Sequence, residues 1–237
     1  MKLVVITPVG PWHEEYAKAA AASVEAAMRH SMGRFTEVRH VIVDDTRGQM
    51  GRARARNCAM AEDADWYFFL DADDTMFPLA LEYNDFDVPA TFGAVWHDGM
   101  IGKRKQNVYP CGWREIALCG ARGTLSMGFF VDAALARNMR FREDIDVGED
   151  YDFYMRLPRF TKVQPALVAI GYRLPSAGGP RGYVEVDWIG TCDAIIEAAV
   201  EREPDKYDLR GDAVLAKAQS TGRERRELFA ALSRRGA

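Results

Sequence analysis

Three carboxylates stand within four residues at Asp71-Ala72-Asp73-Asp74. They directly follow the apolar run 66–70, which is typical of a buried strand. Carboxylates at the end of a strand can present oxygen ligands to a hard divalent cation such as Mg²⁺ or Mn²⁺. Such a cation would bridge to a phosphate and neutralise the charge on a leaving diphosphate. The alternative is an Asp-rich turn in which Asp74 or Thr75 is the N-cap of a following helix.

A second acidic pair, Asp44-Asp45, follows the apolar run 38–43. These carboxylates could accept hydrogen bonds from a nucleobase or a ribose, or could form an Asx turn. In an open parallel sheet, ligands bind beyond the carboxyl ends of the strands, so both acidic groups are expected at the same edge. Like charges at one edge repel unless a cation or a ligand compensates them, which favours a binding site.

Four arginines lie between the two acidic groups, at Arg47, Arg52, Arg54 and Arg56. Helical spacing places Arg52 and Arg56 on one face of a helix and Arg54 on the other. We expect at least one of them to face the acidic edge as a counter-charge or a phosphate donor. The others fit a solvated helix face.

A third acidic cluster, Gly148-Glu149-Asp150-Tyr151-Asp152, precedes a predicted helix. The helix dipole favours carboxylates there, but three acids in four residues exceed what a cap requires. Asp150 would suit a general base that deprotonates a hydroxyl nucleophile, provided that the fold returns it to the strand-end acids.

The elements that must position these acids predict an α/β domain. Apolar runs at 3–6, 38–43 and 66–70 indicate strands, the first two of the fully buried kind found in parallel sheets. Ala-rich segments at 14–30 and 48–61 predict helices between them. Strand, helix and strand in this order imply a right-handed βαβ unit.

The rest of the chain is less regular, and no linker divides it, so residues 1–237 are expected to form one domain. Further expected elements are strands at 91–96, 106–109 and 167–172, helices at 132–138, 188–203 and 223–234, and a Gly/Pro-rich loop at 175–182.

Composition excludes several classes of protein. The 237 residues carry 31 Lys and Arg against 35 Asp and Glu, a net charge of −4, which argues against nucleic-acid binding by bulk electrostatics. No apolar run approaches the ~20 residues that cross a bilayer, and the opening apolar stretch is too short for a signal peptide. A cytoplasmic protein is therefore expected. The cysteines, without a C-x-x-C pair, are expected as free, buried or half-buried thiols: Cys58, Cys111, Cys119 and Cys192.

Taken in order, these motifs resemble the GT-A fold glycosyltransferases of family 2 over residues 1–180. The matching segments are Thr7-Pro8 after the first strand, the VVDD-like 41–45, the ARN-like 55–57, the FLDxDD-like 69–74, the F-x-E-D-like 141–144 with the Gly-Glu-Asp at 148–150, and the helix 151–157 ending in Arg-Leu, followed by Tyr172-Arg173 and Ser176. The resemblance implies an α/β, GT-A-like fold, with a central mixed, mostly parallel sheet flanked by helices and with C-terminal helices. It divides the domain into a nucleotide-sugar half (1–85), an acceptor half (86–182) and a helical extension (183–237).

The resemblance also implies a metal-dependent, inverting transfer of a sugar from a nucleotide-sugar, with UDP-sugars favoured, to an acceptor hydroxyl. The implied nucleotide-sugar-binding residues are Thr7, Pro8, Asp45, Arg56, Asp71, Arg173 and Arg181. The implied ligands of Mn²⁺ or Mg²⁺ are Asp71, Asp73 and Asp74. The implied catalytic residues are Asp150, as the general base, and Glu149. The acceptor stays open among a glycan, a lipid-linked group, a protein and a nucleic acid.

One departure from the family is the segment between Asp45 and Ala55, nine residues where family members place a helix and a further strand. The preferred nucleotide base is therefore open. No histidine follows His97 to complete a metal site. Two other functions stay open: a nucleotidyltransferase of related fold, although 9–12 is no Gly-rich, Lys-bearing loop, and a non-catalytic module that binds a nucleotide-sugar or a partner, in which Asp150 would be dispensable.

Overall fold

The computed structural model describes residues 1–82, 86, 90–92, 95–97, 105–107, 128–145, 147–161, 163–165, 171–173 and 194–195. Several sequence expectations lie outside these residues: Arg181, the loop at 175–182, the helix at 223–234, the helix at 188–203 apart from residues 194–195, and Cys111, Cys119 and Cys192. Of the strands expected at 106–109 and 167–172, only residues 106–107 and 171–172 are described.

Strands and helices alternate through the first half of the chain. In order they are β1 (Lys2–Val9), α1 (Glu14–His30), β2 (Glu37–Asp44), α2 (Arg52–Ala59), β3 (Trp66–Leu70), β4 (Asp74–Met76) and the 3₁₀ turn η1 (Pro78–Ala80). They are followed by β5 (Ala90–Phe92), β6 (Val95–His97), β7 (Lys105–Asn107), β8 (Gly128–Asp132), α5 (Ala133–Met139), α6 (Glu149–Phe160), β9 (Val163–Pro165) and β10 (Gly171–Arg173).

Two sheets organise these strands. The larger sheet has six strands in the order β2-β1-β3-β8-β5-β9, in which only β8 runs antiparallel to its neighbours. The smaller sheet has four strands in the order β4-β10-β6-β7. The predicted mixed, mostly parallel sheet is therefore confirmed, and the βαβ unit of β1, α1 and β2 occurs as predicted.

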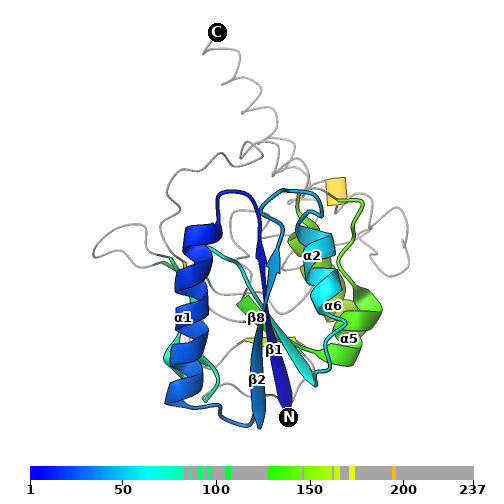
Figure 1. Cartoon of the computed structure of the whole chain (residues 1–237). Helices are drawn as coiled ribbons and strands as arrows, with labels where there is room; N and C mark the ends of the chain where they lie inside the picture. The colour runs from blue at the N-terminus through cyan, green and yellow to red at the C-terminus, as the bar shows by residue number, and fades with distance from the viewer. Residues whose placement is uncertain are drawn as a thin grey trace.

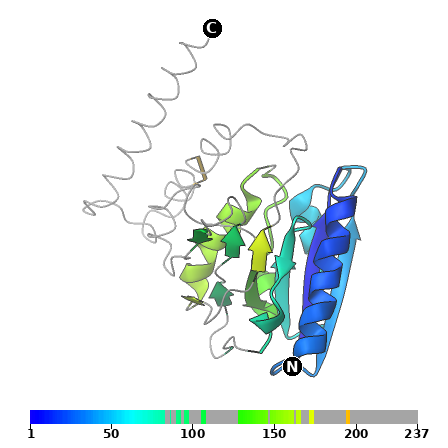
Figure 2. The same cartoon turned by 90° about the vertical axis from the view of Figure 1, so that its left-hand side faces the viewer.

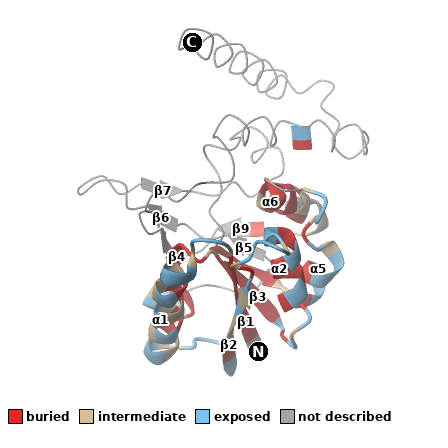
Figure 3. Ribbon diagram, turned by 45° about the horizontal axis from the view of Figure 1, so that its top comes forward, coloured by how far each residue is buried: buried red, intermediate tan, exposed pale blue. Residues whose placement is uncertain are grey.

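Helices cover both faces of the larger sheet. Figure 1 shows α1 on one side and α2, α5 and α6 on the other, and in Figure 2 α1 lies in front of the first strands. Alternate residues of β1 divide between two cores: Leu3 and Val5 pack on the side of α1, whereas Val4 and Ile6 pack on the side of α2 and α6. Seven of the eight β1 residues are buried, as expected for a strand covered on both faces. Figure 3 shows β1 and β3 as buried ribbon between the helices. None of the described helices is long and apolar enough to span a membrane.

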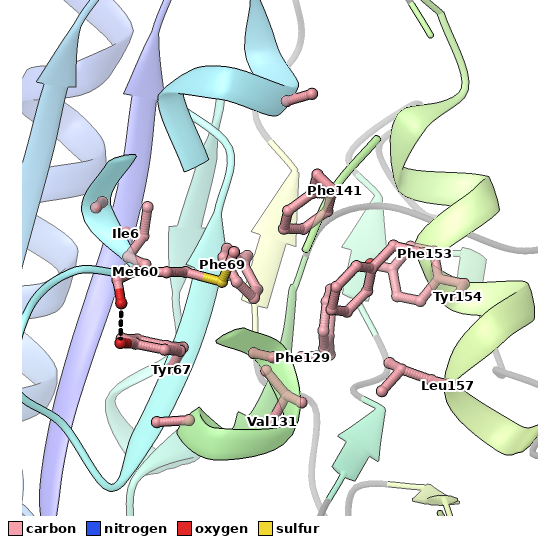
Figure 4. Close-up of a cluster of buried hydrophobic side chains, with 14 of the residues drawn as sticks. Ile6, Met60, Tyr67, Phe69, Phe129, Val131, Phe141, Phe153, Tyr154 and Leu157 are labelled. Carbon is pink, nitrogen blue, oxygen red and sulfur yellow. Dashed lines mark hydrogen bonds between the residues drawn. The ribbon is translucent and has the colours of Figure 1, made fainter. Parts of the chain in front are cut away.

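Aromatic rings fill the core beneath α2 and α6. Figure 4 shows Phe69 and Phe129 from neighbouring strands meeting Phe141 and Phe153 from the α6 side. Phe141 stacks on Phe153 with ring centroids 4.3 Å apart, and its edge meets Phe69 at 5.0 Å. Such pairs add roughly 0.5–1.5 kcal/mol each beyond the burial of their area. The aromatic core therefore holds α6 against the strands.

The prediction that β2 is fully buried was wrong. The strand exists, but it is at the edge of the sheet, and Val38 is its only buried residue. Ile42 is 47% exposed. A continuous β-branched run is typical of a buried strand, yet the same run also forms an edge strand when no further strand pairs with its outer side. Here the segment that follows, 45–51, contains neither a helix nor a strand.

The helix expected at 48–61 is shorter, Arg52–Ala59. Gly48 and Gly51 have φ angles of 64° and 77°, which a helix does not contain. The expectation of a buried thiol is also wrong for Cys58, which is free and exposed on the outer face of α2.

A buried asparagine ties α2 to the segment before α6. Asn57 Nδ2 donates to the carbonyl oxygen of Phe141 at 2.8 Å and to Glu143 Oε1 at 2.9 Å. Its Oδ1 accepts from the N–H of Phe141 at 2.9 Å. One side chain thus satisfies both backbone groups of Phe141 and joins the ARN-like segment to the F-x-E-D-like segment.

Replacing Asn57 by alanine is expected to lower the free energy of unfolding by about 2–3 kcal/mol, because the buried N–H and C=O of Phe141 lose their partners. Equilibrium denaturation in urea measures this change. The exposed neighbour offers the control, Cys58→Ala, for which a change under about 0.5 kcal/mol is expected. Equal stabilities of the two variants would contradict the role of Asn57.

Candidate active site

The carboxyl ends of three neighbouring strands meet at one edge of the larger sheet. Both β2 and β3 pair with β1 in parallel, so all three end on the same side. Asp45 directly follows β2, and Asp71 directly follows β3. The sequence expectation that the two acidic groups share an edge therefore agrees with the topology.

Asp71, Asp73 and Asp74 form a compact carboxylate cluster. Each offers one oxygen, and these oxygens lie within 4.8 Å of one another. Asp73 and Asp74 are buried, and Asp71 is partly exposed. Carboxylate oxygens so close together repel unless a cation compensates them, and hard oxygen donors suit Mg²⁺ or Mn²⁺. The alternative of a helix cap is wrong, because Asp74 begins the strand β4 and the following 3₁₀ turn has Phe77 at its N-cap.

Arg56 supplies a buried counter-charge to this edge. Its guanidinium donates from Nη2 to Asp71 Oδ1 at 2.9 Å and from Nη1 to Glu149 Oε1 at 2.6 Å. Burial alone would lower the pKa of Arg56, but the Glu149 and Asp71 carboxylates outweigh burial and raise its pKa above the ordinary value. The expectation that one arginine faces the acidic edge is confirmed, whereas Arg47, Arg52 and Arg54 are exposed.

The start of α6 brings the third acidic cluster to the same place, and its three acids have different surroundings. Glu149 is buried and paired with Arg56. Asp152 points to the other side, where it accepts from Arg156 Nε at 2.8 Å. Asp150 is half-buried, and its Oδ1 accepts the N–H of Tyr151 at 2.8 Å. The fold therefore brings together two residues, Arg56 and Glu149, that are 93 positions apart in the sequence.

The surroundings of Asp150 favour its neutral form. Burial raises the pKa of Asp150, the Glu149 carboxylate raises it further, and Arg56 only partly opposes them, so that the pKa reaches about 7. Asp71 is close enough to raise it as well. A carboxyl group with a pKa near neutrality can accept a proton from a substrate hydroxyl efficiently at physiological pH.

Asp44 and Asp45 organise the loop that leads to α2. Asp45 Oδ1 accepts the N–H groups of Gln49 and Met50 at 2.7 and 2.9 Å, and Oδ2 accepts that of Gly51 at 2.8 Å. Asp44 forms the Asx turn that was the alternative at sequence level, with the N–H of Thr46 at 3.0 Å, and this bond lowers the pKa of Asp44. The Asp45 carboxylate thus fixes the loop between β2 and α2, and its contact with a nucleotide stays a prediction.

The remaining described residues that were predicted to bind the nucleotide-sugar lie on two strands, β1 and β10. Thr7 is fully buried, with its hydroxyl 2.8 Å from His40 Nε2 on β2. Burial lowers the pKa of His40 to about 4, so this ring is neutral at pH 7. Pro8 is buried in β1 beyond its last pair with β3. The backbone of Arg173 in β10 pairs directly with Asp74 in β4, which places this residue beside the carboxylate cluster.

The joint role of Arg56 and Glu149 was missed at sequence level, where Arg56 was expected near the nucleotide base. One signal was present. Ala53, Ala55 and Asn57 are small side chains next to the arginines, and small residues on opposite sides of a short helix indicate that it is closely packed on more than one side. All three are buried together with Arg56. The identity of its partners depended on tertiary contacts that no spacing encodes.

Comparison with solved structures agrees with this fold. The structure of S. aureus TarS 1–349 in complex with UDP-GlcNAc is similar at 17% identity and a TM-score of 0.60, over 84% of this chain and 67% of that chain. A second structure of S. aureus TarS 1–349 is similar at 18% identity and a TM-score of 0.54, over 73% of this chain and 60% of that one. Glucosyl-3-phosphoglycerate synthase from Mycobacterium tuberculosis is more distant, with 14% identity and a TM-score of 0.47 over 85% of this chain and 79% of that chain. No family model and no curated protein sequence matches this chain.

These similarities establish the fold alone. Sequence identities under 20% give no information on the substrate. The chain has the GT-A glycosyltransferase fold that the resemblance implied. It spans about 60% of the length of the first TarS structure.

The surroundings of Asp150 predict a pH-dependent stability. Its pKa is raised on folding, so its contribution to stability is complete below about pH 4 and is lost as the pH rises through about 7. The variant Asp150→Asn cannot ionise and avoids this loss. Its stability relative to the wild type should be higher at pH 8 than at pH 5 by at least about 1.4 kcal/mol, the equivalent of one pKa unit.

Urea denaturation with EDTA at the two pH values measures this difference. The control is Asp44→Asn, since the pKa of Asp44 is lowered rather than raised. A relative stability of Asp150→Asn that is constant from pH 5 to pH 8 would show that Asp150 has an ordinary pKa.

Proposed function

We propose that this protein is a metal-dependent, inverting glycosyltransferase that acts in the cytoplasm. It moves a sugar from a nucleoside-diphosphate sugar, with UDP-sugars favoured, to an acceptor hydroxyl. The observation that carries the proposal is the meeting of two acidic groups: α6 places Asp150, with its raised pKa, beside the edge that carries the carboxylate cluster of Asp71, Asp73 and Asp74. A base next to a cation site suits attack of a hydroxyl at the anomeric carbon of a nucleotide-sugar, because the base accepts the hydroxyl proton and the cation stabilises the leaving diphosphate.

The carboxylate cluster would hold Mn²⁺ or Mg²⁺. The donor set fits, because three carboxylates each offer an oxygen within a small volume. Asp71 would belong to both the cation site and the ion pair, because it offers one oxygen to the cluster and its Oδ1 accepts from Arg56. The cation would neutralise charge on the departing diphosphate. Arg173, which is in register with Asp74, and Arg181 would add positive charge over the same group, because cations stabilise the charge that develops on phosphate oxygens.

Asp150 would activate the acceptor. As the hydroxyl oxygen attacks the anomeric carbon, its proton passes to the Asp150 carboxylate, and the bond from the anomeric carbon to the diphosphate oxygen breaks on the opposite face. The nucleoside diphosphate leaves with the bonding electrons, and the configuration at the anomeric carbon inverts. A pKa of about 7 keeps a useful fraction of Asp150 ionised at neutral pH while leaving it basic enough to accept the proton.

The fold supports a nucleotide-sugar as the donor. TarS, which has the same fold, is described in complex with UDP-GlcNAc. In this chain the segment between β2 and α2 is a short loop held by Asp45, so we expect the base contacts to come from Thr7, Pro8 and Asp45 and from the loop backbone. Thr7 can contribute only its backbone in the present arrangement, because its side chain is buried against His40.

A thermal-shift series tests the donor site. Wild type and Asp73→Asn are heated with UDP, GDP, UDP-glucose or UDP-GlcNAc, each with and without Mn²⁺. A ligand at 100 times its dissociation constant stabilises the native state by about 2.7 kcal/mol, so a clear rise in the melting temperature is expected for a uridine ligand with Mn²⁺. The rise should disappear in Asp73→Asn and persist in the exposed control Asp44→Asn. No shift with any nucleotide would reject the donor site.

A second measurement tests the base. Release of UDP from the UDP-sugar that gives the largest shift, with water as the acceptor, should increase as the pH rises through about 7, because only ionised Asp150 accepts the proton. Asp150→Asn should lower this rate by about 100-fold or more and leave the UDP and Mn²⁺ shift intact. Unchanged turnover in Asp150→Asn, with intact binding, would reject the assignment of the base.

A further inference from the structure

A single buried side chain connects the two halves of the candidate active site. The guanidinium of Arg56 is 2.9 Å from Asp71 at the end of β3 and 2.6 Å from Glu149 at the start of α6. We propose that Arg56 is a positioning residue, whose two ion pairs fix the first turn of α6, and therefore Asp150, relative to the strand-end carboxylates. The inference rests on the proposed function and adds to it the element that sets the distance between base and donor.

Arg56 is placed to hold protein groups. Its side chain is 3% exposed, and each terminal nitrogen already donates to a carboxylate. The ring of Phe141 lies 5.3 Å from the guanidinium carbon and covers the group further. A planar guanidinium with two occupied nitrogens fixes the relative orientation of its partners, which a rounded ammonium group cannot do.

Glu149 is likewise placed to hold a protein group. Its side chain is 2% exposed, and Oε1 is bound to Arg56. A carboxylate buried in this way acts through the arginine that it binds, so we assign Glu149 to positioning rather than to the catalytic pair implied by the resemblance. Its immediate neighbour Asp150 is the half-buried one.

Two consecutive residues of α2 therefore hold the beginning of α6. Asn57 binds the backbone of Phe141 in the preceding segment, and Arg56 binds the first residue of the helix itself. Asn57 contributes neutral hydrogen bonds to the fold, whereas Arg56 also contacts Asp71. Of these two residues, Arg56 is the one that links the base-bearing turn to a proposed metal ligand. A misplacement of about 1 Å between reacting groups can cost about 100-fold in rate.

The test uses two variants that keep every charge. Arg56→Lys replaces the planar fork by a single ammonium, and Glu149→Asp shortens the other partner by one methylene. The matched control is Arg54→Lys, an exposed arginine on the same helix. Calorimetry with UDP and Mn²⁺ gives the dissociation constant, and UDP release from UDP-glucose or UDP-GlcNAc gives kcat and KM. Melting temperatures confirm that each variant is folded.

A positioning role predicts a split between binding and turnover. Arg56→Lys and Glu149→Asp should each lower kcat at least tenfold while the UDP dissociation constant stays within threefold of the wild type. The double variant should be little worse than the more severe single one, because both changes break one bridge. Unchanged kcat in folded variants overturns the inference and leaves the proposed function standing. Equal losses of binding and turnover overturn it too, because Arg56 would then be a donor-binding residue.

Hydrogen exchange on the wild type tests the bridge without any substitution. Addition of UDP and Mn²⁺ should slow amide exchange at residues 71–74 and also in the first turn of α6, residues 149–153. Protection confined to 71–74 overturns the inference, even if both variants fail to fold. A wild type that neither binds UDP with Mn²⁺ nor releases UDP rejects the proposed function, and the inference falls with it.

Discussion

One buried positive charge makes the acidic edge of this protein possible. Transfer of a guanidinium from water into a protein costs several kcal/mol unless it is paired, and Arg56 is paired on both sides. The dependence is mutual, because the buried Glu149 and the partly exposed Asp71 would repel each other without the guanidinium between them. The arginine is not stable there without its carboxylate partners, and the carboxylates are not stable there without the arginine. The end of β3, the helix α2 and the start of α6 must therefore assemble as one unit.

Neighbouring acids in this unit differ because their surroundings differ. Glu149 lies against a cation and Asp152 against Arg156, while Asp150 between them has burial and a like charge as its main influences. Three carboxylates in four residues thus divide into two structural groups and one that can exchange a proton. Environment, rather than residue type, separates these roles.

Sequence patterns predicted β1, β2 and β3 and the acidic positions that follow β2 and β3, because apolar runs that end in aspartates report local structure directly. The strands β4, β8 and β9 were not predicted, and the run 91–96, expected as one strand, is divided between β5 in the larger sheet and β6 in the smaller one. The helix Glu14–His30 was predicted at its observed ends. The patterns failed where the answer depended on what packs alongside. The run 38–43 cannot reveal whether another strand covers it, and the start of α2 depends on the φ angles of Gly48 and Gly51. No local pattern could pair Arg56 with Glu149.

The short loop after β2 also has a consequence for how copies of this protein meet. With a single neighbouring strand among the described residues, β2 has a row of backbone N–H and C=O groups on its outer side, a template on which extended chains pair. Charged side chains discourage such pairing, and this strand has Glu37 and Arg39 near one end and Asp44 at the other. These charges oppose pairing between copies along β2, so their neutralisation would favour association through this strand, in which Ile42 is exposed.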